Sequence, residues 1–243
     1  MALALSEMAG IVGKDYTGGK ILPILMDLIK DENSEVKLNV CNGLIKVAKV
    51  VGPEILSAPF TTTLTNMTKE GQWRVRMAVF ELIGEMSKMF GKETFQKHLE
   101  SVFLSYLSNT AASVREMGVK KAKELAEKFK GDWVMSTFVP KVIETYNVDK
   151  QGYNYRMCCL MSLQAIIPFI TKEQISSHVI PIFLKAMKDP IPNVRFTVAK
   201  ILQKSKSQLD AGAVASQIIP GLKEMTSDSD RDVQYYATVA INE

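Results

Sequence analysis

Apolar residues recur at intervals of three and four along most of this chain, as they do on one side of an α-helix. In the stretch 75–90, for example, Val75, Val79, Leu82 and Met86 keep that spacing. A wide apolar stripe of this kind is typical of a helix that is covered on more than one side. Alternation with a period of two, which would predict β-strands, is absent over useful lengths. The pattern therefore predicts an all-α fold.

A short signature, Val followed by Lys or Arg, repeats along the chain with a period of about 39 residues. In one copy Tyr stands before the Arg, and the last copy has Gln at its second position. The residues at the second position are Lys37, Arg76, Arg115, Arg156, Arg195 and Gln234.

Two further series keep the same register. Pro23, Pro140, Pro181 and Pro220 each follow a Leu, Val or Ile. Acidic or amide residues lie six or seven positions before each member of the first series: Asp31, Glu70, Asn109, Asp149, Asp189 and Asp228.

The three series predict the layout of one unit. A first helix carries the proline near its start, where the missing N–H costs little. A polar turn follows, and a longer second helix then begins at the Val-Lys/Arg signature. Gly52, Gly91 and Gly131 fall just past second helices, where a left-handed C-cap is expected.

A single helix–turn–helix unit of this length cannot bury its apolar faces alone, so neighbouring units must stack into an α-solenoid. The period and the layout match HEAT repeats, whereas tetratricopeptide and ankyrin repeats have shorter periods. We therefore expect an all-α HEAT-repeat α-α superhelix and a single solenoid over residues 1–243, cut in mid-repeat from a longer one. The expected boundaries are a partial repeat at 1–15 and repeats at about 17–54, 55–93, 94–132, 133–173, 174–212 and 213–243, the last one truncated.

Composition adds little beyond a globular class. The chain has 243 residues, of which 47% are hydrophobic and 23% charged, which is enough to bury a sizeable core. The net charge of +4 is too small to argue for a nucleic-acid or membrane partner. Three cysteines argue against a disulfide framework and favour a reducing compartment. We expect a cytoplasmic protein, with the nucleus as a second location.

Three segments carry a likeness to a known family: 31–39 (DENSEVKLN), 72–76 (QWRVR) and 189–200 (DPIPNVRFTVAK). The stretch 127–133 (EKFKGDW) and Pro140-Lys-Val fit as well. Together they resemble the scaffold (A) regulatory subunit of protein phosphatase 2A. The likeness covers essentially the whole chain and corresponds to the last six of that family's fifteen HEAT repeats.

The resemblance implies a function. Members of that family are not enzymes; they are hook-shaped scaffolds that hold the phosphatase catalytic subunit on the turns of their last five repeats. A variable regulatory subunit docks mostly on N-terminal repeats, which have no counterpart in this chain. The resemblance thus implies that the partner is a phosphatase catalytic subunit, and neither nucleic acid nor membrane.

Trp73 and Arg74 are the first candidates for partner binding. Trp and Arg are typical of interface hot spots, and the matching pair in the family contacts the catalytic subunit. The alternative is that Trp73 packs over the turn of an adjacent repeat. One departure from the family concerns Ala112, which stands where the family has a Tyr in the next turn.

Further candidates for partner binding lie in later turns. For each, the alternative is a turn residue that packs on its neighbour. These candidates are Tyr153, Tyr155, Ile191, Asn193 and Arg231.

The recurring arginines could bind phosphate, but their regular pairing with the acidic series predicts a structural ladder of Asp–Arg pairs between adjacent turns. Lys37 and Gln234 should weaken this ladder at its two ends. The lysine-rich stretch 120–130 includes interleaved glutamates and predicts a solvated helix face. The ladder residues expected are Asp31, Arg76, Arg115, Arg156, Asp189 and Arg195.

Catalysis has little support in the sequence. His98 and His178 lie in different repeats, the adjacent Cys158 and Cys159 do not suit zinc, and no nucleotide-binding or nucleophile motif is present. We expect no catalytic residue, metal or cofactor. The alternative function is a generic or transport-type HEAT adaptor that binds peptide segments on its concave face.

Overall fold

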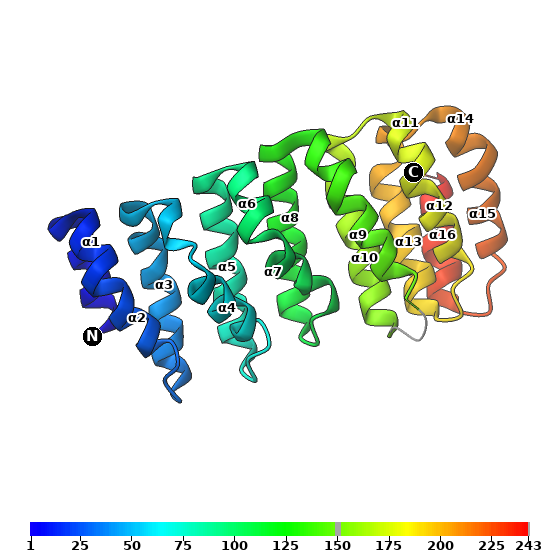
Figure 1. The fold of residues 1–243 in the computed structure, drawn as a ribbon. Helices are drawn as coiled ribbons and strands as arrows, with labels where there is room; N and C mark the ends of the chain where they lie inside the picture. Colours follow the sequence, from blue (N-terminus) through cyan, green and yellow to red (C-terminus); the bar gives the residue numbers. More distant parts are fainter. Residues whose placement is uncertain (149–151, 243) are drawn as a thin grey trace. The chain divides into compact units, whose positions relative to one another are not determined.

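The computed structural model of the protein describes residues 1–148 and 152–242. They divide into two compact units, Met1–Lys121 and Ala122–Glu243. All regular structure in the described residues is helical (Figure 1). Asp149, a member of the acidic series, lies outside the described residues.

Unit 1 is built from first and second helices that are joined by short turns. The second helices α3 and α5 pack against each other, and α1 packs against α3 on its other side (Figure 1). The elements are α1 (Ala2–Tyr16), η1 (Thr17–Ile21), α2 (Leu22–Leu28), α3 (Ser34–Val51), η2 (Pro53–Ile55), α4 (Ala58–Met67), α5 (Trp73–Phe90), α6 (Lys92–His98), α7 (Glu100–Leu104), η3 (Ser105–Ser108) and the first part of α8 (Ala112–Trp133).

Unit 2 begins with the second part of α8 and then repeats this arrangement. The second helices α10, α13 and α16 form one layer, in which α13 contacts both of the others, and α12 packs against α15 in the layer of first helices. The elements are η4 (Val134–Phe138), α9 (Val139–Tyr146), α10 (Tyr153–Ile166), η5 (Ile167–Phe169), α11 (Lys172–Gln174), η6 (Ile175–Val179), α12 (Ile180–Met187), α13 (Pro192–Ser205), η7 (Lys206–Gln208), α14 (Ala211–Ala213), η8 (Val214–Ile218), α15 (Ile219–Met225) and α16 (Arg231–Asn242).

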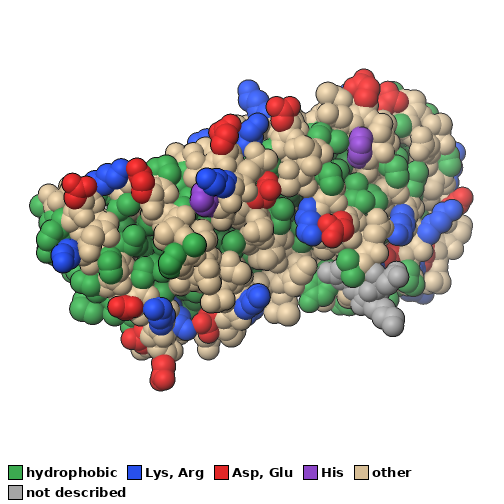
Figure 2. Space-filling model, in the orientation of Figure 1, with side chains coloured by type: hydrophobic (Ala, Val, Ile, Leu, Met, Phe, Trp, Pro, Cys, Tyr) green, Lys and Arg blue, Asp and Glu red, His purple; other side chains and the backbone are tan. Residues whose placement is uncertain are grey.

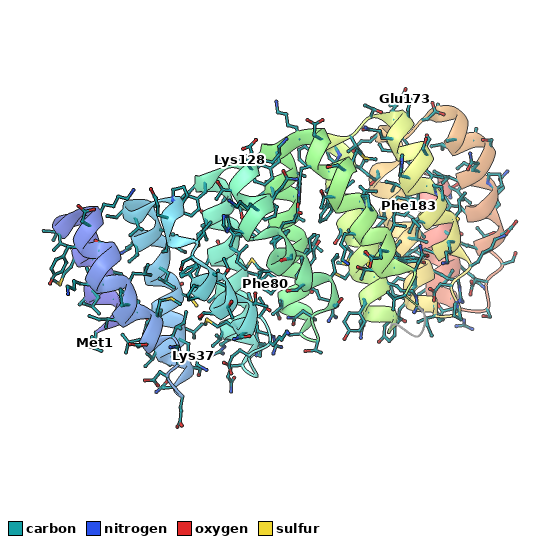
Figure 3. The ribbon with its side chains drawn as sticks, viewed as in Figure 1. Met1, Lys37, Phe80, Lys128, Glu173 and Phe183 are labelled. Atoms are coloured by element: carbon teal, nitrogen blue, oxygen red, sulfur yellow. The ribbon has the colours of Figure 1, made fainter. Side chains whose placement is uncertain are left out.

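The apolar stripes of these helices form the core of each unit. In α5 the predicted positions Val75, Val79, Leu82 and Met86 are all buried, and Phe80 is buried with them (Figure 3). The burial of helix faces on several sides is what a stacked helix pair requires. The all-α prediction is confirmed, and within each unit the helix pairs stack as expected.

The prolines do not mark the true starts of the first helices. A π-helical turn, η1, η4, η6 or η8, precedes the α-helical segment that carries Pro23, Pro140, Pro181 or Pro220 at its second position. Proline has no N–H to donate and clashes with the carbonyl four residues earlier, so wider π-helical winding accommodates it within a continuous helical rod. The first helix therefore begins several residues earlier than the prolines predict.

The residue that follows each of the first four second helices has a positive φ. The sequence pattern predicted one of these four positions wrongly. Gly13, Gly52 and Gly91 have φ between 81° and 84°, and the fourth member of this series is Lys130 with φ 58°, not the predicted Gly131. These four positions keep the period of the Val-Lys/Arg signature. In all of them ψ lies near 180°, so the backbone is extended rather than left-handed helical.

The helix face predicted to be solvated at residues 120–130 contains one buried lysine. The side chain of Lys121 is only 4% exposed, and its Nζ lies 2.7 Å from Glu81 Oε1 and 3.1 Å from Glu85 Oε1. Its methylenes cross Gly84, where a Cβ would come within 2.8 Å of Lys121 Cδ. The absence of a side chain at Gly84 thus lets a lysine lie between two second helices and pair with the glutamates of α5.

Replacing Lys130 with glycine should stabilise the protein. The conformation of Lys130 is one that only glycine adopts freely, and such strain costs on the order of 1–3 kcal/mol, partly offset by the entropy that glycine adds to the unfolded chain. We expect Lys130→Gly to raise the free energy of unfolding by about 1 kcal/mol, measured by urea denaturation.

The matched control for this prediction is Lys123→Gly, the same change at an exposed helical position of α8. It should lower the free energy of unfolding by about 1 kcal/mol, because glycine weakens a helix interior. A destabilisation of similar size in both variants would show that Lys130 is not strained.

Candidate functional site

Trp73 and Arg74 lie where the turn after α4 enters α5. The sequence places them in the turn itself, but the helix already begins at Trp73, with Gln72 as its N-cap. The Trp73 side chain is 43% exposed, and the guanidinium carbon of Arg74 lies 5.6 Å from the centre of its ring. An exposed indole that carries a stacked guanidinium is a typical anchor for a protein partner.

The helix itself explains why these two side chains point outward. Val75 and Arg76 are the next residues along α5, and both are buried. The buried face of the first turn is therefore used by these residues, and Trp73 and Arg74 are left on the open side. Ala112 is also exposed where it begins α8, but its methyl group offers a partner little contact.

The remaining candidates begin second helices of unit 2. Tyr153 is the first residue of α10 and is 38% exposed, while Tyr155 in the same turn is half-buried. Ile191 is the half-buried N-cap of α13, Asn193 is exposed in its first turn, and Arg231 begins α16 and is exposed. Within unit 2 these residues therefore share one location, the N-termini of adjacent second helices.

Ion pairs connect the successive turns of unit 2. Arg156 Nε donates to Asp189 Oδ2 and its Nη2 to Asp189 Oδ1, at 2.7 and 2.8 Å. Arg195 binds Asp228 in the same two-bond geometry, at 2.7 Å in both bonds. Arg195 Nη1 also donates to the carbonyl of Asp189 in its own turn. One guanidinium thus connects two turns.

These contacts change the pKa values of their partners. The hydrogen bond from Arg195 holds the pKa of Asp228 below its ordinary value. The hydrogen bonds to Asp189 and Asp228 hold the pKa values of Arg156 and Arg195 above the ordinary arginine value. Because their partners are already carboxylates of the chain, these two arginines are structural rather than free to bind phosphate.

Unit 1 also has an ion pair between successive turns, but it is formed by Lys and Glu instead of Arg and Asp. Lys37 occupies the basic position of α3, near the turn end of the helix, and its Nζ lies 2.6 Å from Glu70 Oε2 (Figure 3). This hydrogen bond lowers the pKa of Glu70. Asp31 accepts a hydrogen bond from the backbone N–H of Asn33, so it shapes its own turn. Among the described residues no ion pair is recorded for Asp31.

Arg76 and Arg115 use their Nη1 atoms within their own turns. Arg76 donates to the carbonyls of Glu70 and Gly71, and Arg115 donates to those of Asn109 and Thr110. The acidic member that the sequence places after Arg115 is Asp149, which lies outside the described residues.

A second surface, which the sequence pattern did not indicate, lies on the second helices of unit 2. Lys200 Nζ lies 4.6 Å from the centre of the Phe196 ring and 3.8 Å from that of Tyr236. Tyr235 is 62% exposed and packs edge-on against Tyr236. The sequence shows two adjacent aromatic residues, Tyr235 and Tyr236, directly after Gln234. Their contact with α13 can be seen only once the two helices are packed together.

The described residues contain no group of three or more His, Cys, Asp or Glu that could hold a metal ion. Burial raises the pKa of the Cys41 thiol to about 12, so this thiol is protonated and unreactive at neutral pH. An open depression of about 1020 Å³ is lined in part by Met135, Phe169 and Ile170. No described helix is both long enough and apolar enough to cross a bilayer.

The HEAT repeat family model matches residues 21–51, which hold α2 and α3, and residues 179–204, which hold α12 and all but the last residue of α13. Each matched segment is a first helix, a turn and a second helix of the kind described above. These segments are similar to HEAT repeats, and the all-α fold of stacked helix pairs is of the HEAT-repeat class that the sequence predicted.

Several relatives of this chain are regulatory subunits of serine/threonine phosphatases. The regulatory subunit 1 of protein phosphatase 4 from Mus musculus is 22% identical over 98% of this chain and 26% of its own length. The A-type regulatory subunit of protein phosphatase PP2A from Saccharomyces cerevisiae is 29% identical over 50% of this chain and 20% of its own. The PP2A 65 kDa regulatory subunit of Drosophila melanogaster is 45% identical, over 22% of this chain and 9% of its own length.

This chain thus spans about a quarter or less of the length of these relatives. Among solved structures it is similar to Kap95p in a structure with RanGDP, with a TM-score of 0.70 and 13% identity over 90% of this chain and 29% of that one. Cex1p gives a TM-score of 0.62 with 16% identity, over 92% of this chain and 43% of its own. At these identities the likeness concerns the fold alone.

The pairing of Arg195 with Asp228 predicts a loss of stability in acid. Because the pKa of Asp228 is lowered in the folded protein, its contribution is complete above the unfolded-state pKa near 4 and is lost as pH falls through the folded-state value. We expect Asp228→Asn to lower the free energy of unfolding by about 1–2 kcal/mol at pH 7 and by almost nothing at pH 2.

Urea denaturation across this pH range measures the effect. Asp210→Asn is the matched control in unit 2, because Asp210 caps α14 by accepting from the Ala213 N–H, and asparagine caps a helix equally well. A difference between Asp228→Asn and the wild type that does not depend on pH would contradict the ion-pair assignment.

Proposed function

We propose that this chain is a non-catalytic scaffold that binds the catalytic subunit of a PP2A-type serine/threonine phosphatase. The contact surface would be the row of turns and helix N-termini that carries Trp73 and Arg74 in unit 1. The equivalent positions of unit 2 would add weaker contacts. The similarity to regulatory subunits of two phosphatases of this type supports the proposal.

The observation that carries the proposal is the exposure of Trp73. A tryptophan that is 43% exposed, with an arginine beside its ring, leaves a large apolar surface open to a partner. Burying such a pair against a partner removes much apolar surface from water, and Trp and Arg dominate measured interface energies. The hydrogen-bonded turns beside it would present this pair with little loss of conformational entropy on binding.

Two catalytic subunits are candidates for the partner, that of PP2A and that of phosphatase 4. The PP2A scaffold relatives have the higher identity but over shorter segments, whereas the phosphatase 4 relative extends over nearly the whole chain. We place PP2A first, and the binding experiment below includes the phosphatase 4 catalytic subunit. A variable regulatory subunit would bind mostly to repeats outside this chain, and the complex would be cytoplasmic, with the nucleus as a second location.

A second candidate function is peptide binding on the second-helix layer, as in a generic or transport-type HEAT adaptor. The surface that favours it is formed by Phe196, Lys200, Tyr235 and Tyr236. Aromatic rings with a central lysine could bind a peptide that carries apolar and acidic side chains. This candidate predicts that Tyr235, rather than Trp73, is needed for binding.

Truncation of Trp73 tests the two functions against each other. We expect Trp73→Ala to weaken binding of the purified PP2A catalytic subunit by about 2 kcal/mol or more, which is roughly thirtyfold, and the double change with Arg74→Ala to weaken it further. Titration by biolayer interferometry gives the dissociation constants, with the phosphatase 4 catalytic subunit measured in parallel.

The matched control is Tyr235→Ala, another exposed aromatic residue, which lies in unit 2 on the second-helix layer. Its affinity for the catalytic subunit should equal that of the wild type. Loss of binding in Tyr235→Ala with full binding in Trp73→Ala would favour the peptide-binding function. Absence of binding by folded wild-type protein to both catalytic subunits would refute the scaffold proposal.

A further inference from the structure

The ion pairs between turns follow a fixed spacing. A basic residue on a second helix reaches an acidic residue 33 positions later in Lys37–Glu70, Arg156–Asp189 and Arg195–Asp228. Applied to Arg76, this spacing leads to Asn109, which has no carboxylate. Asn109 Oδ1 accepts from the Ala111 N–H at 3.1 Å, and its Nδ2 donates to the Thr68 carbonyl at 3.4 Å.

Arg76 is therefore left incompletely paired. It is only 9% exposed, and its Nη1 donates to the carbonyls of its own turn. Its buried Nε has no hydrogen-bond partner among the described residues. In unit 2 the same atom of Arg156 and of Arg195 donates to a carboxylate oxygen at 2.7 Å. An unpaired buried guanidinium N–H is costly, because it has lost water and gained no acceptor.

A pocket of about 360 Å³ that is lined by residues with polar side chains adjoins this guanidinium. Its lining has no carboxylate and includes two cationic side chains, Lys69 and Arg76. The nearby carboxylate of Glu70 is held by Lys37 at 2.6 Å. The other lining side chains are short and polar: Thr68, Ser105, Ser108, Asn109 and Thr110.

We propose that this pocket binds an oxyanion, and that the oxyanion is the carboxylate of an Asp or Glu side chain from the protein that docks on the turns. The partner would supply the acid that the chain itself supplies at Asp189 and Asp228. This inference rests on the proposed function, because Trp73 and Arg74 begin the helix that also carries Arg76.

The chemistry favours a carboxylate over other acceptors. A carboxylate takes two parallel hydrogen bonds from the Nε and Nη2 edge of a guanidinium, which is the geometry that Arg156 and Arg195 adopt. The incoming group displaces the Asn109 amide from its long bond to the Thr68 carbonyl. Lys69, which is exposed at the rim, adds a second positive charge that attracts an acidic side chain.

The variant Asn109→Asp places the chain's own carboxylate beside Arg76 and so competes with any outside anion. In a sodium chloride solution, the melting temperature of Asn109→Asp should exceed that of the wild type. At constant ionic strength, replacing chloride with sodium acetate or sodium phosphate should raise the wild-type melting temperature saturably by about 2 °C or more. In Asn109→Asp this rise should be absent.

The matched control is Asn33→Asp, the same change of charge at a helix N-cap in unit 1, where aspartate caps as well as asparagine. It should keep the anion-dependent rise of the wild type. An equal rise in Asn109→Asp, or no rise in the wild type, would overturn the oxyanion site. A rise with phosphate but none with acetate would overturn the assignment to a carboxylate.

Binding of the catalytic subunit tests the source of the carboxylate. Asn109→Asp should bind at least about tenfold more weakly than Asn33→Asp, because two carboxylates then compete for one guanidinium. If Trp73→Ala loses binding while Asn109→Asp and Asn33→Asp bind equally, the partner carboxylate is refuted and the scaffold function stands. If Trp73→Ala also binds fully, the docking surface that both proposals require is refuted.

Discussion

The contact on which the arrangement of the turns depends is a basic side chain near the start of a second helix that connects its own turn with the next one. Arg195 shows it in full, since one guanidinium binds the carbonyl of Asp189 and the carboxylate of Asp228. A two-helix repeat buries its apolar faces only against neighbouring repeats. The directional charged bonds fix how each turn lies against the next one.

This connection also bears on the proposed binding surface at the turns. Residues held by hydrogen-bonded turns lose little conformational freedom when a partner arrives. In unit 1 the exposed Trp73 follows directly after such a turn, and Lys37 and Glu70 pair beside it. Apolar side chains of α1 such as Met1, Leu3 and Ile11 are also exposed, and hydrophobic side chains gather over this helix in Figure 2. Exposure alone therefore does not single out a site.

Much of the fold was predictable because it repeats. The regular period of the Val-Lys/Arg signature fixes the helix pairs, and the acidic and basic series fix which turns pair, as Arg156 with Asp189 shows. What was not predictable depends on single departures from the repeat. Lys130 adopts the backbone conformation of a glycine position, and the lysine of α8 that lies in the interior, Lys121, depends on the missing side chain of Gly84. The period does lead from Gly91 to position 130, but the strain on a lysine there and the burial of Lys121 required the structure.

The central claim is that the turns, rather than the second-helix layer, contact a phosphatase catalytic subunit. Hydrogen–deuterium exchange of the chain with and without saturating PP2A catalytic subunit tests it most directly. We predict slower exchange at the N-termini of α5, α10, α13 and α16, with the largest effect in the turn before Trp73. Unchanged exchange in these segments, with protection confined to the Phe196 and Tyr236 surface, would contradict the claim.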